Sequence, residues 1–252
     1  MIEVIVLGSG TGVPYLRRSS SGYCVKIDGE PILFEMGAGT VRRLLEAGID
    51  YRSIRHLFIT HRHPDHCADL VPYLFALNYT PGFKRQEPLE LYGPAGFSEI
   101  VRKMMDLFPW TVPKHYRLDI KEVERGEIKG GNWKITSRPV MHGDVLAVSY
   151  RVESGGKVVV YSGDSGYCEE LIENAKNADL FIVECSFPEK MELKGVHLNT
   201  QEVAEIANKA GAKRLVLTHL YPFCDEAGVV EEINRTFPGK VEKGEDLARI
   251  VL

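Results

Sequence analysis

Residues 60–66 read Thr-His-Arg-His-Pro-Asp-His and directly follow the apolar run Leu-Phe-Ile at positions 57–59. Four side chains in this segment can bind a metal ion, namely His61, His63, Asp65 and His66. Because residues two apart in a strand face the same side, the imidazoles of His61 and His63 should point together. The chain then turns and presents the other two side chains from a first helical turn. The segment therefore predicts a metal site where a strand meets a helix.

Three more candidate ligands follow strand-like runs further along the chain. His142 comes after the run 134–140, Asp164 after 158–161 and His219 after 215–218. A lone histidine at a strand end is more often an ordinary surface residue, but three such side chains in order behind residues 61–66 favour metal binding. Together they exceed the four ligands of one tetrahedral ion, so a second metal ion is expected.

Strand-like and helix-like patterns alternate in both halves of the chain. Strands are expected at 2–7, 23–27, 32–34, 56–60, 89–92, 134–140, 146–152, 158–161, 180–184 and 215–218. Helices are expected near 40–47, after 66, and near 97–107, 168–175, 200–210 and 226–235. Helices on both sides of strongly apolar strands predict a layered α/β fold.

Length and composition restrict the class of protein. The 252 residues suit one large domain or two small ones, and no linker-like segment divides them, so we expect a single domain over residues 1–252. The content of 44% hydrophobic and 26% charged residues is typical of a globular protein. No apolar run reaches the roughly 18 to 20 residues of a membrane span, and no charged leader precedes the first strand. We therefore expect a cytoplasmic protein with no membrane partner.

Charge and cysteine usage exclude further classes. The net charge of -4 argues against binding a nucleic acid over a wide basic surface, and the pair Arg17-Arg18 is expected to be solvated. The five cysteines are widely spaced without a Cys-x-x-Cys pair, so we expect reduced thiols and no disulfide framework.

These motifs resemble the metallo-β-lactamase superfamily and, within it, the ribonuclease Z-like branch. The resemblance covers nearly the whole chain and rests on segments 34–40, 61–66, 162–165, 184–187, 197–200 and 217–219 together with His142. It implies a four-layer αβ/βα sandwich with two metal ions at one edge between the sheets. It also implies a homodimer.

The resemblance also implies a role for each ligand. One zinc ion would be held by His61, His63 and His142, the other by Asp65, His66 and His219, and Asp164 would bridge them. The nitrogen and oxygen ligands would also suit Mn²⁺ or Fe. The flavodiiron branch has Glu at the position of His63, which argues against dioxygen or nitric oxide chemistry in this chain.

Three residues are expected to be catalytic. Glu184 and His197 resemble the ribonuclease Z pair in which the glutamate orients the histidine as a general acid. The alternative is that Glu184 only forms a salt bridge and that His197 is an ordinary loop residue. Asp65 is expected to act in catalysis as well as in metal binding.

Three departures from the family bear on the substrate. Glu35 stands where the family has Asp, and a change in such a supporting residue commonly costs 10- to 100-fold in metal affinity or activity. His142 and Asp164 are only 22 positions apart, so the long arm that grips transfer RNA is absent. The chain also lacks an overall basic face.

We therefore expect a phosphodiesterase that acts on a small-molecule or single-stranded nucleotide substrate, or on RNA held by another route. The missing arm argues against transfer RNA as the substrate. A hydrolase of a carboxylic ester, lactone or thioester is the alternative. A non-enzymatic metal-binding module is a third hypothesis.

Overall fold

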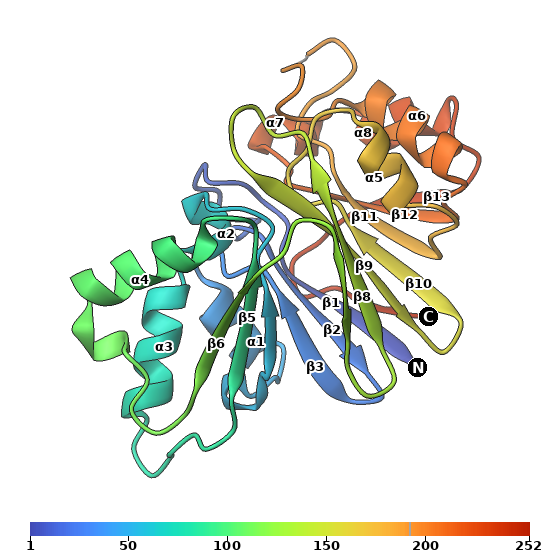
Figure 1. Ribbon diagram of the computed structural model, residues 1–252. Helices are drawn as coiled ribbons and strands as arrows, with labels where there is room; N and C mark the ends of the chain where they lie inside the picture. The colour runs from blue at the N-terminus through green and yellow to red at the C-terminus, as the bar shows by residue number, and fades with distance from the viewer. Residues whose placement is uncertain (192) are drawn as a thin grey trace.

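Two seven-stranded sheets pack face to face in the computed structural model, which describes residues 1–191 and 193–252 (Figure 1). The order of the first sheet is β14 (Arg249–Val251), β1 (Ile2–Gly8), β2 (Gly22–Ile27), β3 (Glu30–Phe34), β4 (His56–Phe58), β5 (Leu89–Gly93) and β6 (Leu118–Glu122). The order of the second is β13 (Lys240–Lys243), β12 (Arg214–Thr218), β11 (Leu180–Glu184), β10 (Lys157–Tyr161), β9 (Ala147–Ser154), β8 (Lys134–Val140) and β7 (Gly126–Lys129).

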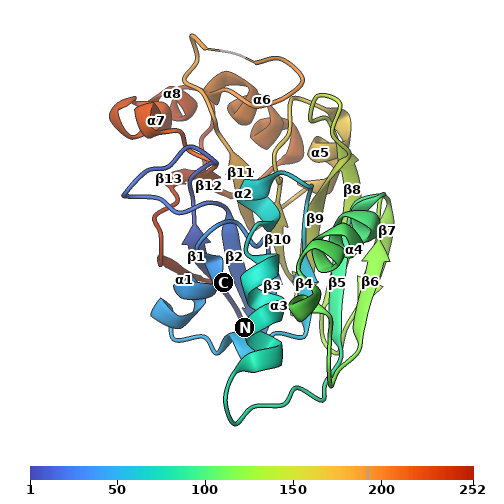
Figure 2. The same ribbon diagram turned by 90° about the vertical axis from the view of Figure 1, so that its left-hand side faces the viewer.

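Helices cover the outer face of each sheet, as the two views in Figures 1 and 2 show. The first sheet carries α1 (Thr40–Glu46), α3 (Leu70–Tyr79) and α4 (Phe97–Leu107). The second carries α5 (Glu169–Asn174), α6 (Thr200–Ala210) and α8 (Val229–Asn234). The remaining helical segments are α2 (Pro64–Cys67), α7 (Pro222–Glu226), η1 (Tyr51–Ser53) and η2 (Pro109–Thr111). No helix in residues 1–191 and 193–252 is long and apolar enough to cross a membrane.

Alternation of side chains explains the four layers. In β1, Val4 and Val6 pack into the core between the sheets, whereas Ile5 and Leu7 pack under the outer helices. Successive side chains of a strand point to opposite faces, so a strand covered on both faces is apolar throughout. The predicted αβ/βα sandwich is confirmed.

The strands that the sequence pattern failed to predict are the four sheet edges. They are β6 and β14 in the first sheet and β7 and β13 in the second. Their sequences, such as Lys-Val-Glu-Lys in β13, alternate charged and apolar residues over only three to five positions. Short, charged edge strands discourage pairing with other chains, and the same charges weaken the strand signal.

The helix expected near residues 226–235 is present as α8, but it starts three residues later than expected, because a separate short helix, α7, ends at Glu226. Pro222 begins α7 at its first helical position, and the chain then becomes extended at Ala227 (ψ 148°) before α8 starts after Gly228. Proline at the first turn and glycine at a break are both favourable, whereas glycine inside one continuous helix costs about 1 kcal/mol.

Parallel pairing places many chain turns at the same sheet edge. In the first sheet β3 and β4 run parallel, and in the second β10, β11 and β12 run parallel. Glu184 is the last residue of β11, and the residues just after the other strands include Glu35, His61, Asp164 and His219. In open α/β sheets this carboxyl edge of the strands is where ligands bind.

A tight hairpin occupies the interval between His142 and Asp164. Strands β9 and β10 pair antiparallel and are joined only by Gly155 (φ 55°) and Gly156 (φ 75°). Two consecutive residues with positive φ are what a two-residue hairpin turn of the favoured twist requires. The expected absence of a long arm at this position is confirmed.

Arg18 links the loop of residues 9–21 to α7 through an ion pair with Asp225. Contrary to the expectation of a solvated pair, its side chain is fully buried and its Nη2 lies 2.5 Å from Asp225 Oδ1 and 3.0 Å from Glu245 Oε1. The guanidinium also donates to Ser9 Oγ (2.7 Å) and to the carbonyl of Gly244.

Replacing Arg18 by Met should therefore lower the free energy of unfolding by about 3–5 kcal/mol, because it leaves the Asp225 carboxylate buried without its partner. Urea denaturation followed by circular dichroism would measure the loss. Arg17→Met is the matched control: Arg17 is 59% exposed and 3.8 Å from Asp225, so it should cost no more than about 1 kcal/mol. Equal losses in the two variants would contradict the role of Arg18.

Candidate metal centre

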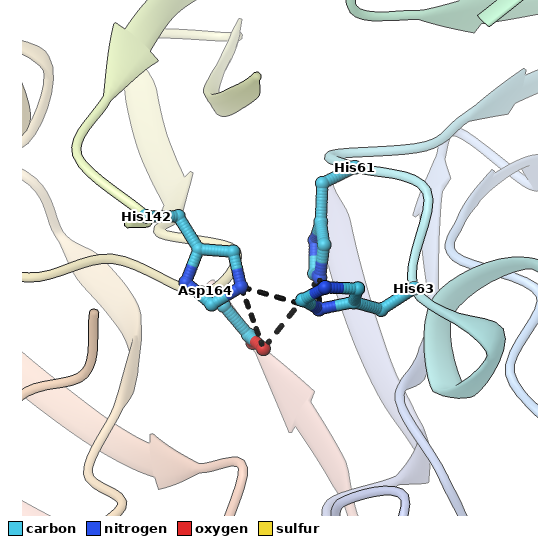
Figure 3. Close-up of side chains that lie close together, drawn as sticks. All are labelled: His61, His63, His142 and Asp164. Atoms are coloured by element: carbon cyan, nitrogen blue, oxygen red, sulfur yellow. Dashed lines mark hydrogen bonds and ion pairs between the residues drawn. The ribbon is translucent and has the colours of Figure 1, made fainter. Parts of the chain in front are cut away.

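Seven potential ligands from both halves of the chain converge at the carboxyl edge of the two sheets. Figure 3 shows His61 and His63 facing His142 and Asp164 across the gap between the first and the second sheet. The set contains five histidines and two aspartates: His61, His63, Asp65, His66, His142, Asp164 and His219. All seven were predicted from the sequence as ligands, and the structure brings them together in two groups that share Asp164.

The first group has the spacing of a tetrahedral ligand shell. His63 Nδ1 lies 3.0 Å from His61 Nε2 and 3.2 Å from His142 Nε2. Asp164 Oδ2 is 3.7 Å from His61 Nε2 and 4.0 Å from His142 Nε2. A tetrahedral ion with bonds of about 2.0–2.2 Å holds its ligand atoms roughly 3.4 Å apart. The four atoms therefore fit around one divalent cation.

The second group repeats this spacing beside the first. His219 Nε2 lies 3.3 Å from Asp65 Oδ2 and 3.1 Å from Asp164 Oδ2. His66 Nε2 lies 3.6 Å from Asp65 Oδ2 and 3.3 Å from Asp164 Oδ1. His66 Nε2 and Asp164 Oδ1 are buried without a hydrogen-bond partner in the described chain. Because buried polar atoms are normally satisfied, a cation between them fits this group as well.

Hydrogen bonds on the far side of three rings determine which nitrogen faces the site. His142 Nδ1 donates to the carbonyl of Val196 (2.8 Å), and His219 Nδ1 bonds to Ser186 Oγ (3.0 Å). His61 Nδ1 bonds to Thr60 Oγ1 (3.1 Å). Such partners hold a histidine in one tautomer and one orientation and increase its basicity as a ligand.

Glu35 supports two candidate ligands from a strained backbone position. It is fully buried, has a positive φ of 66°, and accepts hydrogen bonds from the backbone N–H and the hydroxyl of Thr60. Its Oε1 also lies 3.2 Å from His66 Nδ1. Glu35 therefore positions His66 directly and His61 through Thr60. A positive φ outside glycine costs about 1–3 kcal/mol and is typical of functional sites.

Shortening this support should weaken metal binding. Glu35→Asp withdraws the carboxylate by one methylene from both Thr60 and His66, so we expect a 10- to 100-fold loss of metal affinity, the usual effect of a displaced supporting residue. Competition with a chromogenic chelator would measure it. Glu90→Asp, on the first sheet away from the ligands, should leave the affinity unchanged; unchanged affinity in Glu35→Asp as well would contradict the assigned role.

The charges within the centre match a site for cations. Burial lowers the pKa of His61 well below its ordinary value, and the neighbouring His66 lowers it further, so His61 is neutral as a ligand must be. Burial opposes ionisation of Asp65, yet a hydrogen bond to His219 and the charge of His66 lower the pKa of Asp65 to about 2.

His66 and Asp164 lie deeper in the centre. Burial opposes a charge on His66, but the carboxylates of Asp164 and Glu35 raise the pKa of His66 well above its ordinary value. Burial likewise opposes ionisation of Asp164, but His219 and His66 hold the pKa of Asp164 well below its ordinary value. The space between these carboxylates therefore favours positive charge, as a cation site does.

Glu184 organises a second set of side chains next to the ligands. Its Oε1 accepts from His197 Nδ1 (2.9 Å) and from the backbone N–H of Ser165 (2.9 Å). Its Oε2 accepts from Ser186 Oγ (2.7 Å) and from the N–H of Leu198 (3.2 Å). The buried carboxylate thus holds His197 directly and the candidate ligand His219 through Ser186.

His197 lies between the two ligand groups. Its ring centroid is 5.1 Å from that of His142 and 5.0 Å from that of His219. Burial opposes its protonation, but the charge of Glu184 and the hydrogen bond to it raise the pKa of His197 above its ordinary value. With Nδ1 bound to Glu184, Nε2 lies on the other side of the ring and has no hydrogen-bond partner among residues 1–191 and 193–252. The next residues cap α6: the side chain of Asn199 accepts from Glu202 N (3.0 Å), so the segment after His197 is held in place.

Sequence reasoning did not identify Thr60 and Ser186 as parts of the centre. Both are fully buried and each hydrogen-bonds one ligand and one glutamate. The sequence feature that could have identified them is their position, because each lies within a segment that also carries a candidate site residue.

Comparison with known proteins gives matches over nearly the whole chain. Residues 32–220 match the model of the β-lactamase superfamily domain. A ribonuclease Z of Mycobacterium sp. (strain KMS) is 32% identical over 275 residues, which cover 99% of this chain and 96% of that protein. A ribonuclease Z of Methanothermobacter thermautotrophicus is 28% identical over 303 residues, with 99% and 96% covered.

Solved structures with a similar fold also match nearly the whole chain. The metallo-β-lactamase fold protein YhfI from Bacillus subtilis superposes with a TM-score of 0.87 at 27% identity, covering 99% of this chain and 98% of that one. The short form of human tRNase Z has the same fold, with a TM-score of 0.80 at 22% identity and coverage of 99% and 98%.

Proposed function

The chain belongs to the β-lactamase superfamily, and we propose that it is a metal-dependent phosphodiesterase of the ribonuclease Z type. One observation carries this proposal: the Glu184–His197 pair lies directly beside two ligand groups that share Asp164. A site with two cations stabilises an in-line displacement at phosphorus, and a neighbouring general acid serves a departing alkoxide. The ribonuclease Z names of the relatives support the same reaction class.

We assign two Zn²⁺ ions to the two groups. His61, His63 and His142 would hold one ion, Asp65, His66 and His219 the other, and Asp164 would belong to both. Two such ions, when bound, lower the pKa of a water molecule toward neutrality and neutralise charge on the phosphoryl oxygens. Because the donors are all nitrogen and oxygen, Mn²⁺ or Fe also suits them.

The side chains of this chain supply the remaining steps. His197, kept protonated by Glu184, gives its proton to the leaving oxygen. Asp65 has a carboxylate that is 13% exposed and a pKa lowered to about 2, so it stays ionised and orients the attacking water as a hydrogen-bond acceptor, and the proton of that water passes to solvent. No side-chain nucleophile is needed.

The substrate we propose is a small-molecule or single-stranded nucleotide phosphodiester. The short β9–β10 hairpin and the net charge of -4 leave this chain without the means expected for holding a whole transfer RNA. A homodimer is consistent with the family resemblance and would be measured by sedimentation of the metal-replete protein.

A substrate panel tests the function. Metal-replete protein would be offered bis(p-nitrophenyl) phosphate, a 2′,3′-cyclic nucleotide, a precursor transfer RNA, a lactone and a thioester. We expect hydrolysis of the first two. Hydrolysis confined to the lactone and the thioester would overturn the proposal in favour of an ester or thioester hydrolase, and no hydrolysis of any of them would favour a metal-binding module.

A further inference from the structure

Three aromatic rings form a cluster at the rim of the metal centre. Phe187 follows β11, whereas Tyr221 and Phe223 lie at the start of α7. The planes of the three rings are within 5–13° of parallel, and their centroids are 5.5–6.1 Å apart. We call these residues the aromatic cluster.

The cluster directly adjoins the reacting groups. The ring of Tyr221 is 5.9 Å from that of the ligand His219, at 85°, and the ring of Phe187 is 6.2 Å from that of His197, at 76°. The three parallel planes are therefore nearly perpendicular to these two imidazoles. The reaction proposed above uses none of the three rings.

The rings are partly open to solvent. Phe223 is 39% exposed, and Phe187 and Tyr221 are half-buried, although large aromatic side chains usually fill the core. Exposed apolar surface gathered beside a polar site is typical of a surface that binds a ligand.

The backbone holds the cluster in place before any ligand binds. Asp225 of α7 forms the buried pair with Arg18, and Lys243 Nζ donates to the carbonyls of Cys224 (2.7 Å) and Asp225 (3.0 Å). The carbonyl of Phe187 accepts from the N–H of Thr200 at the start of α6 (3.0 Å). A backbone held in this way loses little conformational entropy on binding.

We propose that the aromatic cluster is a stacking platform for a nucleobase attached next to the scissile phosphate. This rests on the proposed phosphodiesterase function and narrows its substrate from small-molecule or nucleotide phosphodiesters to nucleotides alone. Parallel rings that are partly open to solvent can stack on any base without reading its edges, so the platform should tolerate different bases. The separation of about 6 Å between the cluster and His197 is within the span of a single nucleotide.

A cavity beside His142 differs from the aromatic cluster in its lining. The cavity has a volume of about 330 Å³, and its walls are mainly aliphatic, with Val140, Val145 and Leu146 among them. No Phe, Tyr or Trp contributes to this cavity in the part of the chain that the structure describes. Base stacking is therefore assigned to the aromatic cluster.

Calorimetry on the metal-replete protein tests the platform. Adenosine 5′-monophosphate and ribose 5-phosphate present the same phosphate to the metal centre and differ only in the base. We expect the nucleotide to bind at least about tenfold more tightly, in the range typical of stacking on an aromatic side chain. In Phe223→Leu this preference should fall at least about fivefold, whereas Phe223→Trp should keep it.

Phe75→Leu is the matched control. Phe75 is 46% exposed and stacks on Tyr79 with centroids 4.6 Å apart, but it lies on α3 away from the centre, so the preference should not change. Equal binding of the two ligands by the wild type, or an unchanged preference in Phe223→Leu with normal melting, would overturn the platform. Phosphodiester hydrolysis without a preference for the base would refute only the platform. A preference for the base without phosphodiester hydrolysis would refute only the proposed reaction.

Discussion

Replacing Asp164 by Asn should remove at least one of two metal ions per chain and reduce kcat/KM on a phosphodiester by more than 100-fold. Asp164 is the only residue that belongs to both described ligand groups, with Oδ2 close to His61, His142 and His219 and Oδ1 close to His66. The amide keeps the shape of the carboxylate but loses its charge, so both groups lose the same anionic donor. Displaced supporting residues cost 10- to 100-fold, and loss of a shared ligand should exceed that.

Elemental analysis of the purified variant would count the ions, with activity measured on the same sample. Asp179→Asn is the control, because Asp179 pairs with Lys213 at 2.8 Å and lies outside both ligand groups. It should keep both ions. An Asp164→Asn protein that also retained two ions would contradict the shared role of Asp164.

Loss of metal should also affect folding. The centre packs five imidazoles and two carboxylates at the edge of the sheets, and His66 Nε2 and Asp164 Oδ1 have no hydrogen-bond partner in the described chain. A ligand that binds only the folded state stabilises it in proportion to the logarithm of its concentration over Kd. The melting temperature of wild-type protein should therefore fall on chelation, and that of Asp164→Asn should respond less.

The buried part of the fold could be predicted from the sequence because burial leaves a periodic signal. Strands such as β1 and β11 are apolar on both faces, and their limits were predicted to within one residue. The edge strands could not be predicted, because half of their surface faces solvent and their charged residues interrupt the pattern. The charge of Arg18 led to the wrong prediction that its side chain is solvated. Arg18 is buried because Asp225, 207 positions away in the sequence, folds against it.

The metal centre likewise has a part that could be predicted from the sequence and a part that could not. The residues of the two candidate ligand groups could be selected from the sequence because His61, His63, Asp65 and His66 lie within one short segment, and the others follow strands at the same sheet edge. The partners of those ligands could not. Ser186 reaches His219, 33 positions away, only because β11 and β12 pair in register, and serine is too common to attract notice in a sequence.

Replacing His197 by Ala should reduce turnover of a phosphodiester with a poor leaving group by about 10²- to 10⁴-fold, the usual contribution of a general acid. Bis(p-nitrophenyl) phosphate should lose much less, because its phenolate departs without a proton. The two substrates should therefore separate the donation of a proton from the stabilisation of charge at phosphorus. Steady-state kcat measured on both substrates with fully metal-loaded protein would show the difference.

The same assignment determines the sign of the pH dependence. Only the protonated imidazole can donate, and Glu184 raises the pKa of His197 against the effect of burial, so activity on the poor leaving group should persist above the ordinary histidine pKa and fall at higher pH. Glu184→Gln removes the charge that raises this pKa, so the fall should move to lower pH. On bis(p-nitrophenyl) phosphate, the fall in activity that depends on His197 should be absent from both the wild type and Glu184→Gln.

His56→Ala provides the matched control for His197, because His56 also pairs with a glutamate, with Nδ1 3.2 Å from Glu90 Oε2, but lies outside the ligand groups. The turnover of His56→Ala on both substrates, normalised to the concentration of folded protein, should equal that of the wild type.

Equal losses on the two substrates in His197→Ala would mean that His197 only supports its neighbours His142 and His219. In that case Glu184 would act on the reaction through the ligand His219 and Ser186 alone, and metal content would fall together with activity. A general acid leaves the metal content intact, so measuring both quantities on one sample decides between the two roles.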